Sequence, residues 1–192
     1  MFRHTHFDVD IVRRVDPERL RWPEARQARD DSGFGGNREY CDLRGLTWSD
    51  VAEVLDQESE LILRIETSLD PEDELELIAD ELAEDPGSMM GLDLGVATTA
   101  AALSAAGCVP FASCNGGAYG GLHHETYPLV MFCARRQAVP HLLAAAERAG
   151  VGLESDPSGE VCVYADDIRR MRLFAVELFD DHRRFLNPAG VG

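Results

Sequence analysis

The chain contains no lysine, because all 18 of its basic residues are arginine. The lack of lysine excludes Schiff-base chemistry and a phosphate-binding P-loop, since both need a lysine amine. The chain also has no uninterrupted apolar run approaching the roughly 18 residues that a membrane span needs. Its charged N-terminus is not followed by the apolar stretch of a standard secretion signal. We therefore expect a soluble, cytoplasmic protein that does not contact a membrane.

Cysteine is sparse and irregularly spaced. The five cysteines form no Cys-x-x-Cys pair, and an odd, scattered set is not typical of a disulfide framework or a structural zinc finger. Free thiols in a reducing compartment fit this pattern better. Because an unpaired cysteine behaves as a small apolar residue, we expect Cys108, Cys133 and Cys162 to be packing residues of the core or of the second face of the sheet.

Acidic residues dominate the charge, and they are concentrated in one segment. The net charge of the 192 residues is −17, and residues 50–85 carry fifteen acids and one arginine, whereas residues 1–49 carry nine of each sign. This excess disfavours nucleic acid, because phosphate binding needs clustered cations. The acidic segment 50–85 is either a solvated helix face or a docking surface for a basic protein partner.

The N-terminal half predicts an extension followed by helices. Residues 1–47 mix arginine with aspartate and turn formers, which indicates an irregular N-terminal extension. Residues 48–192 are expected to form a single domain, with an acidic helical segment over 48–87 and a sheet-containing core over 88–192. Within the acidic segment, Thr47 or Ser49 caps a first helix, residues 60–68 have the branched content of a strand while remaining compatible with helix, and Asp70 caps a further helix.

The second half predicts two strand pairs separated by helices. Small residues over 92–107 indicate a closely packed helix ending at Gly107, and Asp166 is the expected cap of the last helix. The expected strands cover 108–114, 127–134, 151–155 and 160–165, and a further helix ends at Gly150. This order predicts an α+β domain of two layers, in which helices cover a mainly antiparallel sheet.

The segment FASCNGGAYGGLHHE, residues 111–125, is the candidate site. In one interpretation Cys114 is a thiol nucleophile and His124 is its base. In another, the loop binds a small polar or anionic ligand without a covalent step, through the N–H groups of its glycines and nearby polar side chains. The expected ligand-binding residues are Ser113, Asn115, Gly116, Gly117, His123 and Glu125. A third interpretation is a wide hairpin loop in which the glycines only supply positive φ angles.

A metal site is the remaining interpretation of this loop, and strand geometry opposes it. Cys108 and Cys114 stand at the two ends of an expected strand, about 20 Å apart at roughly 3.3 Å per residue, so they cannot share one ion. If Cys114 pairs with Pro128 across an antiparallel hairpin, Cys133 falls opposite Val109, far from the loop. We predict no metal ligand, and the sequence indicates no particular cofactor.

Residues 92–132 resemble a block in uncharacterised prokaryotic and phage proteins. The block has a helix led by Asp and Gly, a strand ending in Ser-Cys-x-Gly-Gly, a nearby histidine and a second strand. The matching positions are Asp93, Gly95, Ser113, Cys114, Gly116, Gly117, one of His123 and His124, Pro128, Val130 and Phe132. The resemblance implies no established activity. A more distant similarity is to the Ser-Cys-Ser-Gly-Arg loop of wybutosine-synthesising tRNA methyltransferases, from which this chain departs at Asn115 and Gly117.

These observations predict a small α+β protein that binds a small polar or anionic ligand at the 113–125 loop, with thiol-dependent chemistry as an additional element. The rival prediction is an acidic interaction or immunity-type protein without catalysis, whose residues 50–85 mask a basic partner. Both an enzyme and a binding protein remain open at this point.

Overall fold

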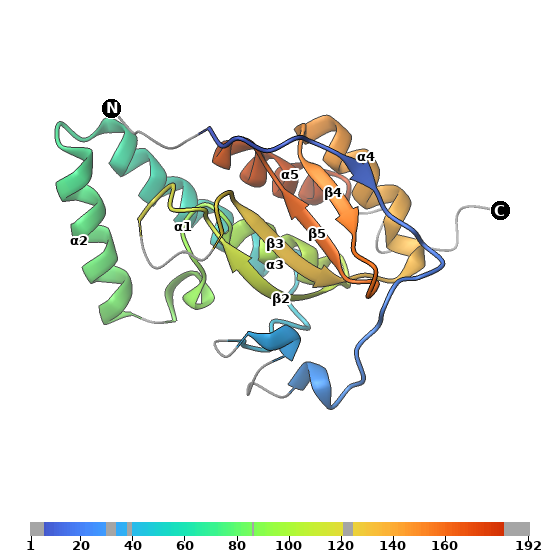
Figure 1. Ribbon diagram of the computed structural model, residues 1–192. Helices are drawn as coiled ribbons and strands as arrows, with labels where there is room; N and C mark the ends of the chain where they lie inside the picture. Colours follow the sequence, from blue (N-terminus) through green and yellow to red (C-terminus); the bar gives the residue numbers. More distant parts are fainter. Residues whose placement is uncertain (1–5, 30–33, 38–39, 86, 121–124, 183–192) are drawn as a thin grey trace.

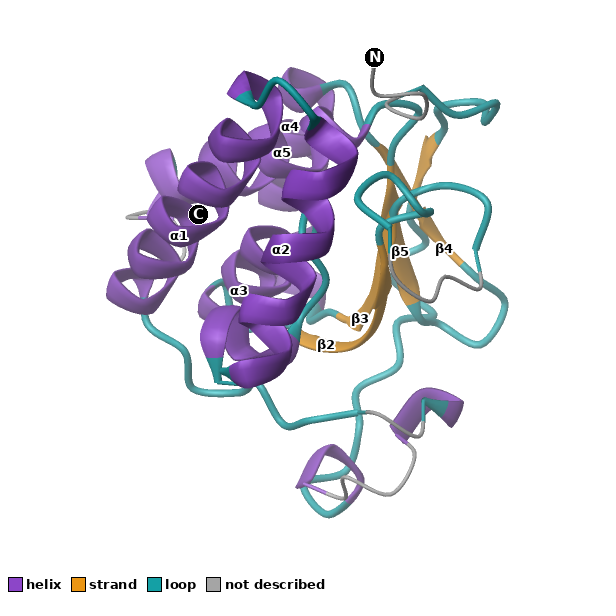
Figure 2. Cartoon of the chain, turned by 90° about the vertical axis from the view of Figure 1, so that its left-hand side faces the viewer, coloured by secondary structure: helices purple, strands orange, loops and turns teal. Residues whose placement is uncertain are grey.

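A five-stranded sheet packs against a layer of α-helices (Figures 1 and 2). The computed structural model describes residues 6–29, 34–37, 40–85, 87–120 and 125–182. The strands are β1 (Arg13–Arg14), β2 (Val109–Cys114), β3 (Leu129–Cys133), β4 (Gly152–Ser155) and β5 (Val161–Tyr164). The helices are α1 (Trp48–Thr67), α2 (Pro71–Glu84), α3 (Ala97–Ala105), α4 (Val139–Ala149) and α5 (Ile168–Asp180). The predicted α+β class is confirmed.

The strand order in the sheet is β1-β4-β5-β3-β2. Only the β1–β4 pair is parallel among the described strands, and the other neighbours are antiparallel. Cys133 lies opposite Val109, as expected, but Cys114 lies opposite Leu129 instead of Pro128. The register shifts by one residue between Pro110 and Ala112, because a bulge there adds a residue to β2.

The helices cover one face of the sheet, as Figure 2 shows. Alternate residues of the central strands, among them Phe132 and Val163, belong to the same buried cluster as residues of α1, α3, α4 and α5. The opposite face carries a smaller cluster that includes Phe34, Tyr40 and Phe111. The Phe34 ring lies 5.0 Å from the Tyr40 ring and 5.3 Å from the Phe111 ring, so the N-terminal extension covers this face near β2.

The N-terminal extension is largely irregular, but it supplies a strand that the sequence did not predict. β1 is two arginines long, pairs with β4 and so forms one edge of the sheet. Elsewhere the extension is held by backbone hydrogen bonds, from Phe7 N–H to the Asp166 carbonyl (2.8 Å) and from Arg21 N–H to the Gly159 carbonyl (2.8 Å). A pairing of this kind depends on the distant strand β4, so the local sequence contains no signal for it.

Helix α1 corrects the strand expected over residues 60–68. One helix of 20 residues runs from Trp48 to Thr67, and Thr47 caps it in a capping box with Asp50. The buried side chains Val51, Val54 and Ile65 recur at helical spacing across the whole length. Strand prediction failed here because branched content was weighed above this periodicity.

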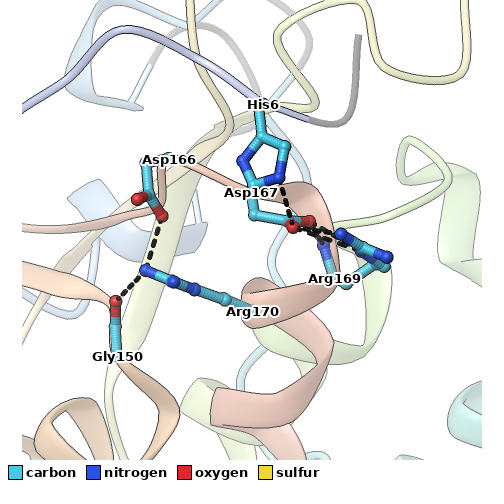
Figure 3. Close-up of polar contacts among 6 residues, drawn as sticks. All are labelled: His6, Gly150, Asp166, Asp167, Arg169 and Arg170. Atoms are coloured by element: carbon cyan, nitrogen blue, oxygen red, sulfur yellow. Dashed lines mark hydrogen bonds and ion pairs between the residues drawn. The ribbon is translucent and has the colours of Figure 1, made fainter. Parts of the chain in front are cut away.

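Two expected caps have different outcomes. The side chain of Asp70 accepts a hydrogen bond from Asp73 N–H and caps α2, as predicted. Asp167, and not Asp166, caps α5, since the Asp167 carboxylate accepts the Arg169 N–H at 3.0 Å. Asp166 instead forms an ion pair with Arg170, whose guanidinium also donates to the Gly150 carbonyl (Figure 3).

Candidate functional site

The predicted loop leaves the end of β2 in a tight turn built around Asn115. The Asn115 side chain is buried, and its amide donates to the Leu94 carbonyl at 3.2 Å and to the Gly120 carbonyl at 3.5 Å. Its oxygen accepts the Gly117 N–H at 2.8 Å. Asn115 therefore ties the loop to the segment that precedes α3, and its polar atoms are engaged within the chain.

The loop glycines are required by the backbone. Gly116 has a φ of +65°, and a Cβ there would lie 2.7 Å from the Tyr127 carbonyl carbon. The amides of the turn also bond within it, because Gly116 N–H donates to the Cys114 sulfur at 3.4 Å and Ala118 N–H to the Asn115 carbonyl at 3.2 Å. The N–H groups of Gly116 and Gly117, which the sequence assigned to an anion, thus already have acceptors in the loop.

Ser113 and Cys114 lie next to each other in β2 but face opposite sides of the sheet, as strand alternation requires. Cys114 is 6% exposed, and Ser113 is half-buried. The other packing cysteines behave as predicted for core thiols, since burial raises the pKa of Cys108, Cys133 and Cys162 to about 12. These three thiols are therefore neutral at physiological pH.

Of the remaining predicted site residues, the structure describes Glu125. His123 and His124 lie outside the described residues. Glu125 is exposed. The pKa of Cys162 is raised first by the burial of its thiol and next by the negative charge of Glu125, so this carboxylate lies near β5. The structure thus brings Ser113, Cys114, Asn115, Gly116 and Gly117 together at the end of β2.

Tyr119, which follows the turn, lines a cleft together with residues of α1 and α5. This cleft, called the α5 cleft below, has a volume of about 520 Å³. It is lined by Ser59, Ile62, Leu63, Glu66, Gly95, Tyr119, Ile168, Arg169 and Arg172. Burial, followed by the charges of Glu66 and Glu58, raises the pKa of Tyr119 to about 12. The Tyr119 hydroxyl is consequently neutral at physiological pH.

The two arginines of the α5 cleft have different partners. Arg169 donates through Nε and Nη2 to the Asp167 carboxylate, which also lies 3.6 Å from His6 Nε2 (Figure 3). Burial of Asp167 acts to raise its pKa, but the hydrogen bonds from Arg169 and the charges of Arg169 and His6 together hold this pKa below its ordinary value. Arg172 donates to the Ser59 hydroxyl at 2.8 Å, and within the described part of the chain it has no carboxylate at ion-pair distance.

A second cleft, called the α2 cleft below, is also lined by Tyr119. Its volume is about 370 Å³. It is lined by Leu75, Ile78, Ala79, Leu82 and Ala83 of α2, by Ser88 and residues 91–94, and by Asn115, Tyr119 and Gly120. Leucine, isoleucine and alanine side chains form the α2 wall. The loop between Asn115 and Gly120 therefore contributes to both clefts.

Glu58 is a buried carboxylate that the sequence interpretation missed. Its oxygens accept hydrogen bonds from Gly95 N–H (2.9 Å), Ala97 N–H (3.1 Å) and the Thr98 hydroxyl (2.5 Å). Burial raises the pKa of Glu58, and these hydrogen bonds oppose the shift. Glu58 caps α3 from α1, since Val96 at the N-cap has no capping side chain. The sequence signal that could have revealed it is the position of Glu58, since this acid falls on the same face of α1 as the buried residues Val51, Val54 and Ile65.

The described residues contain no group of three or more His, Cys, Asp or Glu side chains that could hold a metal ion. None of the helices in the same ranges is long and apolar enough to cross a membrane. Comparisons of the chain with models of protein families, with curated proteins and with solved structures find no match.

Proposed function

We propose that the chain binds a small anionic ligand in the α5 cleft. The observation that carries this proposal is Arg172, a half-buried guanidinium that faces a neutral hydroxyl at 2.8 Å instead of a carboxylate. A guanidinium has five N–H donors in a planar fork, which match the two oxygens of a carboxylate. Tyr119 lines the same cleft.

The size and charge of the α5 cleft fit a small monoanion. Its volume of about 520 Å³ is within the range of small-molecule sites. The charged residues that line it are Glu66, Arg169 and Arg172, and because Arg169 is ion-paired with Asp167, Arg172 is the guanidinium that a ligand would meet. A ligand with one negative charge matches this lining better than one with several.

This proposal retains the loop predicted from the sequence and changes the contacts assigned to it. Asn115, Gly116 and Gly117 shape the turn through hydrogen bonds within the chain, and Tyr119 contacts the ligand. Thiol chemistry at Cys114 with His124 stays a prediction. Alkylation at pH 8 tests it: a nucleophilic Cys114 would react faster than the exposed Cys41, whereas a packing thiol would react as slowly as Cys108.

Acetate titration followed by backbone amide NMR tests the ligand proposal. We expect shifts centred on Tyr119, Gly120 and Arg172, and a loss of affinity of about tenfold or more in Arg172→Gln, because a hydrogen-bonded charge is removed. Arg136→Gln is the matched control, since Arg136 pairs with Glu18 at the exposed surface. Unchanged acetate affinity in Arg172→Gln would refute the proposal.

A second candidate function is docking of a basic protein partner on α1 and α2. Leu63 is 58% exposed, Leu77 is 56% exposed and Leu69 is fully exposed, all within the acidic segment 50–85. Arg64, the one arginine of this segment, is already bound by Glu74 and Glu81. The exposed surface therefore combines apolar side chains with uncompensated acids, a combination that suits a basic amphipathic partner.

Neutralising three exposed acids of α2 tests this candidate. Glu72→Gln, Asp73→Asn and Glu76→Gln leave Glu74 in place, because Glu74 holds Arg64. A partner that co-purifies with the unmodified chain should be basic, and the triple variant should lose it while keeping its thermal stability. A partner retained equally by the triple variant would count against docking through these charges.

A further inference from the structure

The two clefts that meet at Tyr119 differ in chemistry. The α5 cleft carries the guanidiniums of Arg169 and Arg172, whereas the α2 cleft has no basic side chain among the described residues that line it. Its one charged lining residue is the acid Asp93. An anionic group is therefore favoured on the α5 side of Tyr119 and disfavoured on the α2 side.

The α2 cleft suits an aliphatic chain. Leu75, Ile78 and Leu82 recur at helical spacing along α2 and line the cleft, and Leu92 and Leu94 line it from the segment before α3. Its volume of about 370 Å³ is enough for a small apolar group. Gly120 keeps this approach open, since a Cβ there would lie 3.3 Å from a methyl group of Leu75.

Tyr119 lines both clefts and is 8% exposed. Arg172 lines the first cleft with it, and the leucines of α2 line the second. A tyrosine is suited to such a boundary, because its ring packs against apolar groups while its hydroxyl donates to polar ones.

From this arrangement we infer that the ligand is an amphipathic carboxylate. Its head binds Arg172 in the α5 cleft, and its acyl tail lies past Tyr119 in the α2 cleft. This inference rests on the proposed function, and it adds the substrate class: a medium-length acyl anion in place of a small, fully polar one. Each methylene that the tail buries strengthens binding roughly fourfold, from about 0.8 kcal/mol per methylene.

Comparison of octanoate with acetate by calorimetry and amide NMR tests the inference. We expect octanoate to bind about thirtyfold or more tightly than acetate, since several methylenes are buried. Octanol, which has the same chain without the charge, should bind more weakly than octanoate. Octanoate, unlike acetate, should shift the amides of Leu75 and Ala79.

Ala79→Trp separates the tail from the head. Ala79 is exposed and lines the α2 cleft, so an indole there occupies the cleft without disturbing the core. The variant should lower octanoate affinity to that of acetate and leave acetate binding unchanged. Leu77→Trp is the matched control, because Leu77 is on the same helix, is 56% exposed and does not line the cleft.

The outcomes distinguish the inference from the proposal on which it rests. Equal affinity for octanoate and acetate, with acetate still lost in Arg172→Gln, would overturn the amphipathic ligand and leave the anion site standing. Tight octanoate binding that Ala79→Trp does not weaken, or octanol binding as tight as that of octanoate, would also overturn it. If neither acid binds, or if Arg172→Gln changes nothing, the proposed function itself fails.

Discussion

Helices α2 and α3 both pack on α1, but they differ in how much of each helix is buried. Eight of the nine residues of α3 are buried, and α3 sits among α1, α5 and the sheet. Of the 14 residues of α2, only Ile78 is buried, and this helix lies at one end of the molecule beside α1 (Figure 1). The difference indicates that α3 contributes more to stability than α2, since buried area and not helix length determines the contribution to folding.

The largest effect on this contrast is expected from Glu58→Ala. The substitution leaves two N–H groups and the Thr98 hydroxyl at the start of α3 without their acceptor in the core. We expect a loss of about 4–5 kcal/mol in the free energy of unfolding, from about 1–3 kcal/mol per unsatisfied group. Urea denaturation measures it. Glu60→Ala, at an exposed position of the same helix, should change stability little, and equal losses in the two variants would contradict the capping role.

Leu103→Ala in α3 should have the next largest effect. Leu103 is fully buried, so its truncation removes apolar contacts and leaves a cavity in the layer between the helices and the sheet. The expected loss is about 3 kcal/mol, within the range for buried leucine. Denaturation of the variant provides the measurement, and a loss below about 1 kcal/mol would show that the surroundings of α3 collapse readily around the cavity.

Arg64→Ala should act on α2 alone. Arg64 donates to Glu74 and Glu81 and so connects α1 to α2. We expect amide hydrogen exchange in α2 to become roughly two- to fivefold faster, with no change in α3, because exposed ion pairs contribute little to stability. Faster exchange in both helices would mean that they open as one unit.

The same link should weaken in acid. The Arg64 hydrogen bonds lower the pKa of Glu81, so the stabilisation is present above the ordinary glutamate pKa of about 4.3. It is lost as the pH falls through the lowered pKa of the folded state. The protection of the α2 amides, measured relative to their intrinsic exchange rates, should therefore fall below about pH 4, and this loss of protection should be smaller in Arg64→Ala.

Leu77→Ala should have the smallest effect. Leu77 is a large apolar residue on α2, but it is 56% exposed, and we expect its truncation to change the free energy of unfolding by less than about 0.5 kcal/mol. Thermal unfolding beside Leu103→Ala provides the direct contrast. A loss comparable to that of Leu103 would place α2 among the stabilising elements of the fold.

Local signals predicted much of the fold. Asp70 before Pro71 and Gly150 after α4 act through residues a few positions away, and both cap as the sequence indicates. Prediction of strands and of strand register failed where contacts between residues far apart in the sequence determine the structure. β1 exists only because β4 is beside it, and the bulge in β2 shifts the partner of Cys114 by one residue.

The sequence predicted the position of the glycine loop, but not the contacts around it. The glycine spacing pointed to the loop after β2, where the positive φ of Gly116 is needed. The residues that line the clefts come from α1, α2 and α5, and no loop motif reveals that Arg172 lies beside Tyr119. Glu58 illustrates the same limit, because an acid in a helix is ordinary until its partners, Gly95 and Thr98, are known.

The bulge and the N-terminal extension also bear on self-association. β2 is an edge strand, and edge strands invite pairing with another chain. Pro110 has no N–H to offer, the Asn37 side chain occupies the Phe111 carbonyl at 2.9 Å, and the bulge between Pro110 and Ala112 interrupts the strand. At the opposite edge, Arg13 and Arg14 cover β4 with like charges. Both margins of the sheet thus oppose edge-to-edge pairing between folded chains.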